Sequence, residues 1–116
     1  MIKEVGDIEV YPNLFIYVGH SLESEERYEY VLHASDEENT IGQFLDRMTD
    51  GIAMMGFNNI GYDYPVLHHM LGMYRNVSAA ETCINIYRYS DNLIRSDEKP
   101  WIKDKEVRIP QFDLFL

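Results

Sequence analysis

The chain has 116 residues, of which 46% are hydrophobic and 13% aromatic, and it carries a net charge of −10 and a single cysteine, Cys83. This length fits one domain with a modest core, and the composition excludes wholesale disorder. No apolar stretch approaches the roughly 20 residues that span a bilayer, and the N-terminus does not have the pattern of a signal peptide, so we expect a cytoplasmic protein. A lone cysteine excludes an internal disulfide, and we expect Cys83 to be a small buried side chain.

The first third of the chain is typical of an antiparallel meander. Three segments read as strands, and these are Glu4–Tyr11, Leu14–His20 and Arg27–His33. The turn-forming Tyr11–Asn13 separates the first two, and an acidic connection at Glu23–Glu26 separates the second from the third. Strands joined by connections this short pair antiparallel. We therefore predict three hairpin-connected strands.

A helix and a buried strand are predicted next. Thr40–Gln43 has the form of a capping box, in which Gln follows Thr by three residues, and Asp50–Gly51 predicts the end of the helix that it opens. The continuous apolar run Ile52–Phe57 follows directly. Such a run is typical of a strand that is buried on both faces.

Two further helices and a last strand complete the predicted order. One helix runs roughly from Tyr64 to Tyr74, with Pro65 in its first turn, where the missing N–H costs little. The other begins at a second capping box at Ser78 and runs to about Arg95, and Val107–Leu116 is predicted to be a strand. The order β-β-β-α-β-α-α-β indicates an α/β fold with a mixed sheet and helices packed against it.

Two acidic residues of the first strand are candidates for metal binding. Asp7 and Glu9 stand at i and i+2, so their carboxylates lie on one face of the strand, about 7 Å apart. Val5, Ile8 and Val10 indicate that this strand enters a core, where acids are costly unless they bind a cation. An ordinary polar strand face is the alternative interpretation.

The loop after the buried strand is the second candidate segment. Ligands collect at the carboxyl ends of strands in open α/β sheets, and Gly56–Asp63 follows such an end and precedes a helix. Two simpler roles remain open here. Asp63 would serve equally as the N-cap of the Pro65 helix, and Asn58 and Asn59 as turn residues.

Taken together, the two segments resemble a known family. The pattern D-x-E on a first strand, followed by G-F-N-x-x-x-Y-D, resembles exonuclease motifs one and two of family B and related phage DNA polymerases. The resemblance extends along the chain through the segments DIEVYPNLF, GFNNIGYDYPVL and PQFDLF. It implies a ribonuclease H-like fold of the DnaQ-like (DEDD) 3′→5′ exonuclease type, whose opening element order is the one predicted above.

The resemblance also implies roles for individual residues. Asp7 and Glu9 would be the metal ligands of motif one, and Asp63 the ligand of motif two; these three are the catalytic acids. Asn58, or Asn59 if the register shifts by one, would lie near the substrate strand, which would be the 3′ end of single-stranded DNA. Carboxylate oxygens suit Mg²⁺ or Mn²⁺, and two such ions can promote in-line displacement at phosphorus.

The third exonuclease motif has no counterpart where the family places it, beyond the strand predicted at Val107–Leu116. Tyr87 and Asp91 have a spacing like that of the Tyr and Asp of the third motif, but they precede that strand, and we interpret the match as coincidence. Residues 1–116 are therefore predicted to be a partial exonuclease domain, incomplete at its C-terminus. We expect either a fragment of a longer polymerase or a short natural protein that retains half of the nuclease fold, with cation binding even where full activity is lost.

The uneven charge supports an alternative function of a different class. Residues 1–70 carry the whole net charge of −10, whereas residues 71–116 are neutral overall. An acidic half binds nucleic acid poorly without a basic surface from elsewhere, such as the remaining polymerase segment. The alternative is a small acidic phage protein in the host cytoplasm that binds a basic host or defence protein, as a nucleic-acid mimic or a sensed trigger. An open sheet edge would also allow self-association, and no membrane partner is expected.

Overall fold

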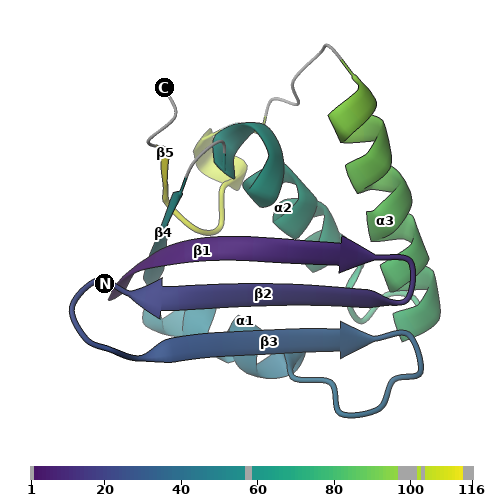
Figure 1. Ribbon diagram of the computed structural model, residues 1–116, viewed down its shortest axis with the longest axis horizontal. Helices are drawn as coiled ribbons and strands as arrows, with labels where there is room; N and C mark the ends of the chain where they lie inside the picture. The colour runs from purple at the N-terminus through teal and green to yellow at the C-terminus, as the bar shows by residue number, and fades with distance from the viewer. Residues whose placement is uncertain (1, 57–58, 97–101, 103, 114–116) are drawn as a thin grey trace.

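The computed structural model describes residues 2–56, 59–96, 102 and 104–113 (Figure 1). Its strands are β1 (Ile2–Tyr11), β2 (Leu14–Ser21), β3 (Arg27–His33), β4 (Ile52–Gly56) and β5 (Gln111–Asp113). Its helices are α1 (Ile41–Asp50), α2 (Tyr64–Met73) and α3 (Ala79–Arg95), with two short helical turns, η1 (Asn59–Asp63) and η2 (Asp104–Glu106). The order of strands and α-helices is the predicted one. None of these helices is long and apolar enough to cross a membrane.

The strands form one mixed sheet in the order β3-β2-β1-β4-β5. The first three pair antiparallel as a meander, whereas β4 runs parallel to β1 and β5 runs parallel to β4. The prediction of a mixed α/β sheet is therefore confirmed. The helices all lie on one side of β1, β2 and β3, and the opposite face of these strands has no helix over it (Figure 1).

Two local predictions were wrong. The last strand does not begin at Val107: residues 107–110 are irregular, and β5 starts only at Gln111. Thr40 does not cap α1 with its side chain, because its Oγ1 accepts a hydrogen bond from the N–H of Val31 at 2.7 Å. At Ser78 the predicted cap is confirmed, since its hydroxyl accepts from the N–H of Glu81 at 3.1 Å.

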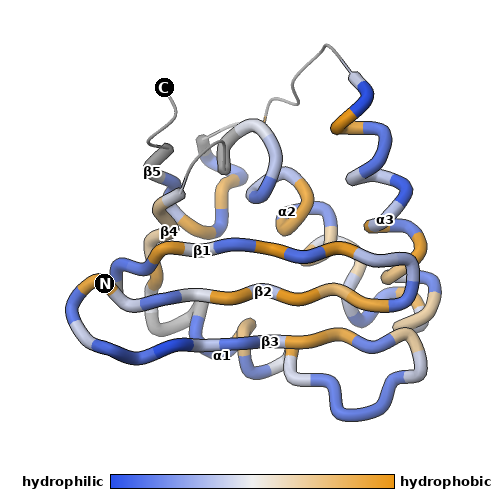
Figure 2. Tube along the Cα trace, viewed as in Figure 1, coloured by the Kyte–Doolittle hydropathy of each residue, from blue (hydrophilic) through white to orange (hydrophobic). Residues whose placement is uncertain are grey.

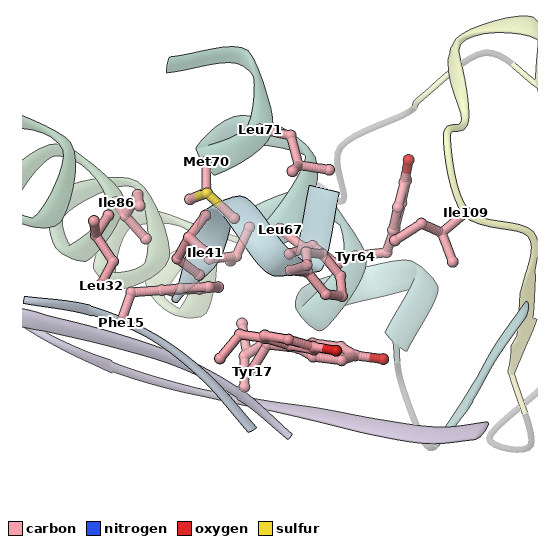
Figure 3. Close-up of a cluster of buried hydrophobic side chains, with 14 of the residues drawn as sticks. Phe15, Tyr17, Leu32, Ile41, Tyr64, Leu67, Met70, Leu71, Ile86 and Ile109 are labelled. Atoms are coloured by element: carbon pink, nitrogen blue, oxygen red, sulfur yellow. The ribbon is translucent and has the colours of Figure 1, made fainter. Parts of the chain in front are cut away.

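The core lies between the sheet and the helices. Apolar colour follows β2 along most of its length (Figure 2), and its buried members alternate in the strand as the pleat requires. Figure 3 shows strand and helix side chains of this core meeting between the two layers. Phe15, Tyr17 and Leu32 come from the sheet, and Ile41, Leu67, Met70 and Ile86 come from the helices. Cys83 is buried in the same core, as expected, and its thiol faces the carbonyl oxygen of Leu32 at 3.5 Å.

One charged group lies within this core. Glu4 on β1 has an exposed fraction of 0%, and its carboxylate accepts a hydrogen bond from the Tyr17 hydroxyl at 2.6 Å and is paired with Arg47 of α1. The Arg47 guanidinium stacks over the ring of Tyr28, 3.6 Å from its centroid, and donates to the Tyr30 hydroxyl at 3.3 Å. A buried carboxylate is costly unless it is paired and hydrogen-bonded, and here both conditions are met.

A candidate metal site built from two aspartates

The two predicted acids of β1 stand on the outer face of the sheet, away from the core. Glu4, Gly6 and Ile8 lie on the inward face of β1, so the residues that alternate with them point the other way. Asp7 and Glu9 are accordingly exposed, and they share one face as predicted. Val5 belongs to this outer face as well, with an exposed fraction of 42%, whereas Ile8 is buried and Val10 packs against the core.

Strand pairing and the turn η1 together bring Asp63 to Asp7. The parallel register places Val5 beside Met55, so β4 ends at Gly56 while β1 continues past it. The turn η1, which ends at Asp63, follows this strand end and contacts both β1 and β5. The site thus forms at the carboxyl end of a parallel strand, where ligands collect in open α/β sheets.

The carboxyl groups of Asp7 and Asp63 form a pair. The pKa of Asp63 is raised to about 7 by burial, by the negative charge of Asp7 and by a hydrogen bond between the two carboxyl groups. Hydrogen bonds from the backbone N–H groups of Asp63 and Ile8 lower this pKa and offset part of the rise. The Ile8 N–H also donates to Oδ1 of Asp7 at 2.9 Å. Below about pH 7 Asp63 is therefore mainly protonated, and above about pH 7 it is mainly ionised.

The simpler role of Asp63 as a helix cap does not fit its geometry. Asp63 precedes α2 directly, but its backbone is already helical, with φ −58° and ψ −48°, and its side chain makes no capping hydrogen bond. A capping residue has an extended backbone, and its side-chain oxygen accepts an N–H of the first turn. The carboxyl group of Asp63 is directed instead toward Asp7, and its pKa is raised first by burial and then by the charge and hydrogen bond of Asp7.

A hydrogen bond that the sequence did not predict helps to hold η1 in place. The hydroxyl of Tyr62 lies 2.5 Å from the Oγ of Ser90 on α3, where Ser90 is buried. Tyr62 also packs against the core. Ser90 could have been found from its position on the buried side of α3, since it is spaced four residues from Ile86.

The remaining predicted site residues have different outcomes. Glu9 is exposed on the same face as Asp7, but the described residues contain no group of three or more Asp, Glu, His or Cys side chains that could hold a metal ion. Asn58 lies outside the described residues, and Asn59 begins η1 without a described side chain. The structure therefore brings together Asp7 and Asp63, and the roles of the other three stay predictions.

The chemistry of the pair suits a hard divalent cation. Its donors are carboxylate oxygens, which Mg²⁺ and Mn²⁺ prefer over nitrogen or sulfur. Asp7 is open to solvent, so a cation can reach the pair, and Asp63 is partly buried, which strengthens its attraction for positive charge. Glu9 lies two residues after Asp7 on the same face of β1 and adds negative charge to the surface that a cation would cross to reach the pair.

Comparison of the chain with protein-family models, with curated proteins and with solved structures finds no match in any of the three.

Proposed function

We propose that the chain is the metal-binding part of a ribonuclease H-like 3′→5′ exonuclease domain, of the type found in phage DNA polymerases. One observation carries the proposal: the carboxyl groups of Asp7 and Asp63, which come from the two motif-like segments, meet at the carboxyl end of β4. The predicted order of strands and helices and the mixed sheet are compatible with that fold.

In this proposal Asp7 and Asp63 hold Mg²⁺ or Mn²⁺, and Glu9 contributes a further carboxylate on the same face. The bound ion supplies activation of water and stabilisation of the leaving 3′ oxygen at a phosphodiester. The chain itself orients the carboxyl groups: the Ile8 N–H fixes Asp7, and the hydrogen bond between Tyr62 and Ser90 fixes the turn that carries Asp63. The substrate would be the 3′ end of single-stranded DNA.

Metal binding is tested first, because it does not depend on activity. Mn²⁺ is paramagnetic, so its binding should broaden the amide NMR signals of Ile8 and Asp63 in the folded protein. Asp7→Asn should abolish this broadening. The matched control is Asp46→Asn, because Asp46 is exposed on α1 and distant in sequence from both segments, and it should bind Mn²⁺ as the wild type does. A folded wild-type protein whose signals do not respond to Mn²⁺ would contradict the proposal.

Nuclease activity is tested with a 5′-labelled single-stranded oligonucleotide and Mg²⁺ or Mn²⁺. The proposal predicts metal-dependent shortening from the 3′ end that is lost in Asp7→Asn and Asp63→Asn and kept in Asp46→Asn. Mn²⁺ binding without shortening would restrict the function of this chain to metal binding, since a residue that orients the attacking water would then have to come from elsewhere.

A further inference from the structure

The outer face of the sheet carries a continuous apolar surface. The side chains that point away from the helices alternate with the buried ones along β1, β2 and β3. We define the outer-face patch by its six apolar members, which are Val5, Tyr11, Leu14, Ile16, Val18 and Val31. None of them belongs to the core cluster or packs against it. No helix covers these strands on this side (Figure 1), so the patch faces solvent in the described structure.

The patch combines two exposed apolar side chains with four partly buried ones. Val5 and Tyr11 are 42% and 48% exposed, and the other four members are partly buried. A sheet face with apolar side chains is normally buried against another layer, most simply a helix. Contiguous apolar patches of this kind mark interaction sites on protein surfaces.

Acidic side chains are interleaved with the patch. The pairing registers place Asp7 and Glu29 on either side of Val18, and Glu9 beside Ile16 in the next row. Two cations border the patch: Lys3, which shares the outer face of β1 with Val5, and Arg27, which is paired with Glu29 at 2.9 Å. An occupant of this surface therefore has to present positive charge next to apolar side chains.

The sheet edge is a less suitable surface than the face. The outer edge of β3 is partly covered by its own loop, because the N–H and C=O of Val31 both bond to Thr40 and the N–H of His33 donates to Asn39. At the uncovered end Arg27 and Glu29 place charges on the edge, a device that discourages strand addition.

We propose that the outer-face patch docks a cationic amphipathic helix of another protein, with an apolar stripe that packs on Val18 and with Lys or Arg that pair with the acids of β1 and β3. A second copy of this chain is disfavoured, because each copy carries a net charge of −10. Nucleic acid and anionic membrane surfaces are disfavoured as occupants of the whole patch for the same reason. This inference does not rest on nuclease activity, but docking uses Asp7 and Glu9, so a docked helix and a metal ion at Asp7 would exclude each other.

The probe is a fluorescently labelled synthetic helix of leucine on one face and lysine on the other, titrated with the protein and followed by anisotropy. Its matched counterpart carries glutamate in place of lysine and should not bind. Val18→Glu should weaken binding of the leucine–lysine helix by at least ~10-fold, because it places a charge in the centre of the apolar contact. Ile94→Glu adds the same charge at a 68% exposed position of α3 and should change binding by less than about twofold.

Three results would overturn the proposal. The first is equal weakening by Val18→Glu and Ile94→Glu, which would mean that net charge alone attracts the probe. The second is equal binding of the leucine–glutamate helix. The third is a wild-type dimer in sedimentation velocity that Val18→Glu dissociates, since the occupant would then be a second copy. If Val18→Glu does not fold, Val18→Thr keeps the β-branched shape and should weaken binding about threefold, whereas unchanged binding would contradict the docking site.

Discussion

Gly19 on β2 is the position where one added methyl group should be most damaging. A Cβ at this residue would lie 2.0 Å from Oε2 of Glu4 and 2.7 Å from its Cδ. Glu4 is fully buried and held by Tyr17 and Arg47, so its carboxylate cannot move aside without leaving both partners. A displaced, unpaired buried charge costs about 3–5 kcal/mol, and overpacking adds about 1–3 kcal/mol.

We therefore expect Gly19→Ala to lower the free energy of unfolding by at least ~3 kcal/mol, which corresponds to a fall of about 1–3 M in the urea midpoint. Gly72→Ala is the control: it lies in α2 with nothing within 4 Å of an added Cβ, and should stabilise the protein by roughly 1 kcal/mol. In a Glu4→Ala background the obstacle is absent, so Gly19→Ala should cost less than about 1 kcal/mol. An equal cost in both backgrounds would refute the assigned clash.

Three further changes have expected outcomes. The pKa of Asp63 is raised to about 7 in the folded state, so folding favours its protonated form, and stability should be highest below about pH 4, fall as the pH rises to about 7, and level off above that. Asp63→Asn should remove this pH dependence of the melting temperature. At pH 8 the variant should be more stable than the wild type by about 1–2 kcal/mol, a figure that allows for the partial solvent access of Asp63. Arg47→Met leaves Glu4 buried without its cation and should cost about 3 kcal/mol in urea unfolding, and adding Glu4→Gln should recover most of that loss. Ser78→Ala removes the hydroxyl that accepts from the N–H of Glu81 and should cost about 1 kcal/mol, with a loss of protection from hydrogen exchange confined to the first turn of α3.

Local patterns were sufficient wherever one short segment decides its own structure. The strand Arg27–His33 and the start of α3 at Ser78 follow from alternation and from a capping residue, and both lie where they were predicted. Thr40 shows the limit of such patterns. Its hydroxyl can serve either a helix N–H or a neighbouring strand, and the N–H of Val31 takes it because folding brings the edge of β3 within reach.

The inward face of β1 could not be read from composition alone. Val5 and Glu4 are adjacent and therefore lie on opposite faces, and hydropathy predicts that the valine is the buried one. The structure has the reverse arrangement, because Tyr17 and Arg47 provide Glu4 with a hydrogen bond and a counter-charge inside the core. Those partners come from β2 and α1, so no local window of the sequence contains them.

For the candidate site, the sequence by itself determined which acids to consider: Asp7 from its place on a first strand, and Asp63 from its place after a buried strand. Only the tertiary structure decided that the two carboxyl groups meet. Their contact depends on the parallel register of β1 with β4, on the end of β4 beside Gly6, and on the turn that carries Asp63 back toward Ile8. The raised pKa of Asp63 belongs to that contact, since burial and a neighbouring charge arise only when distant segments are packed together.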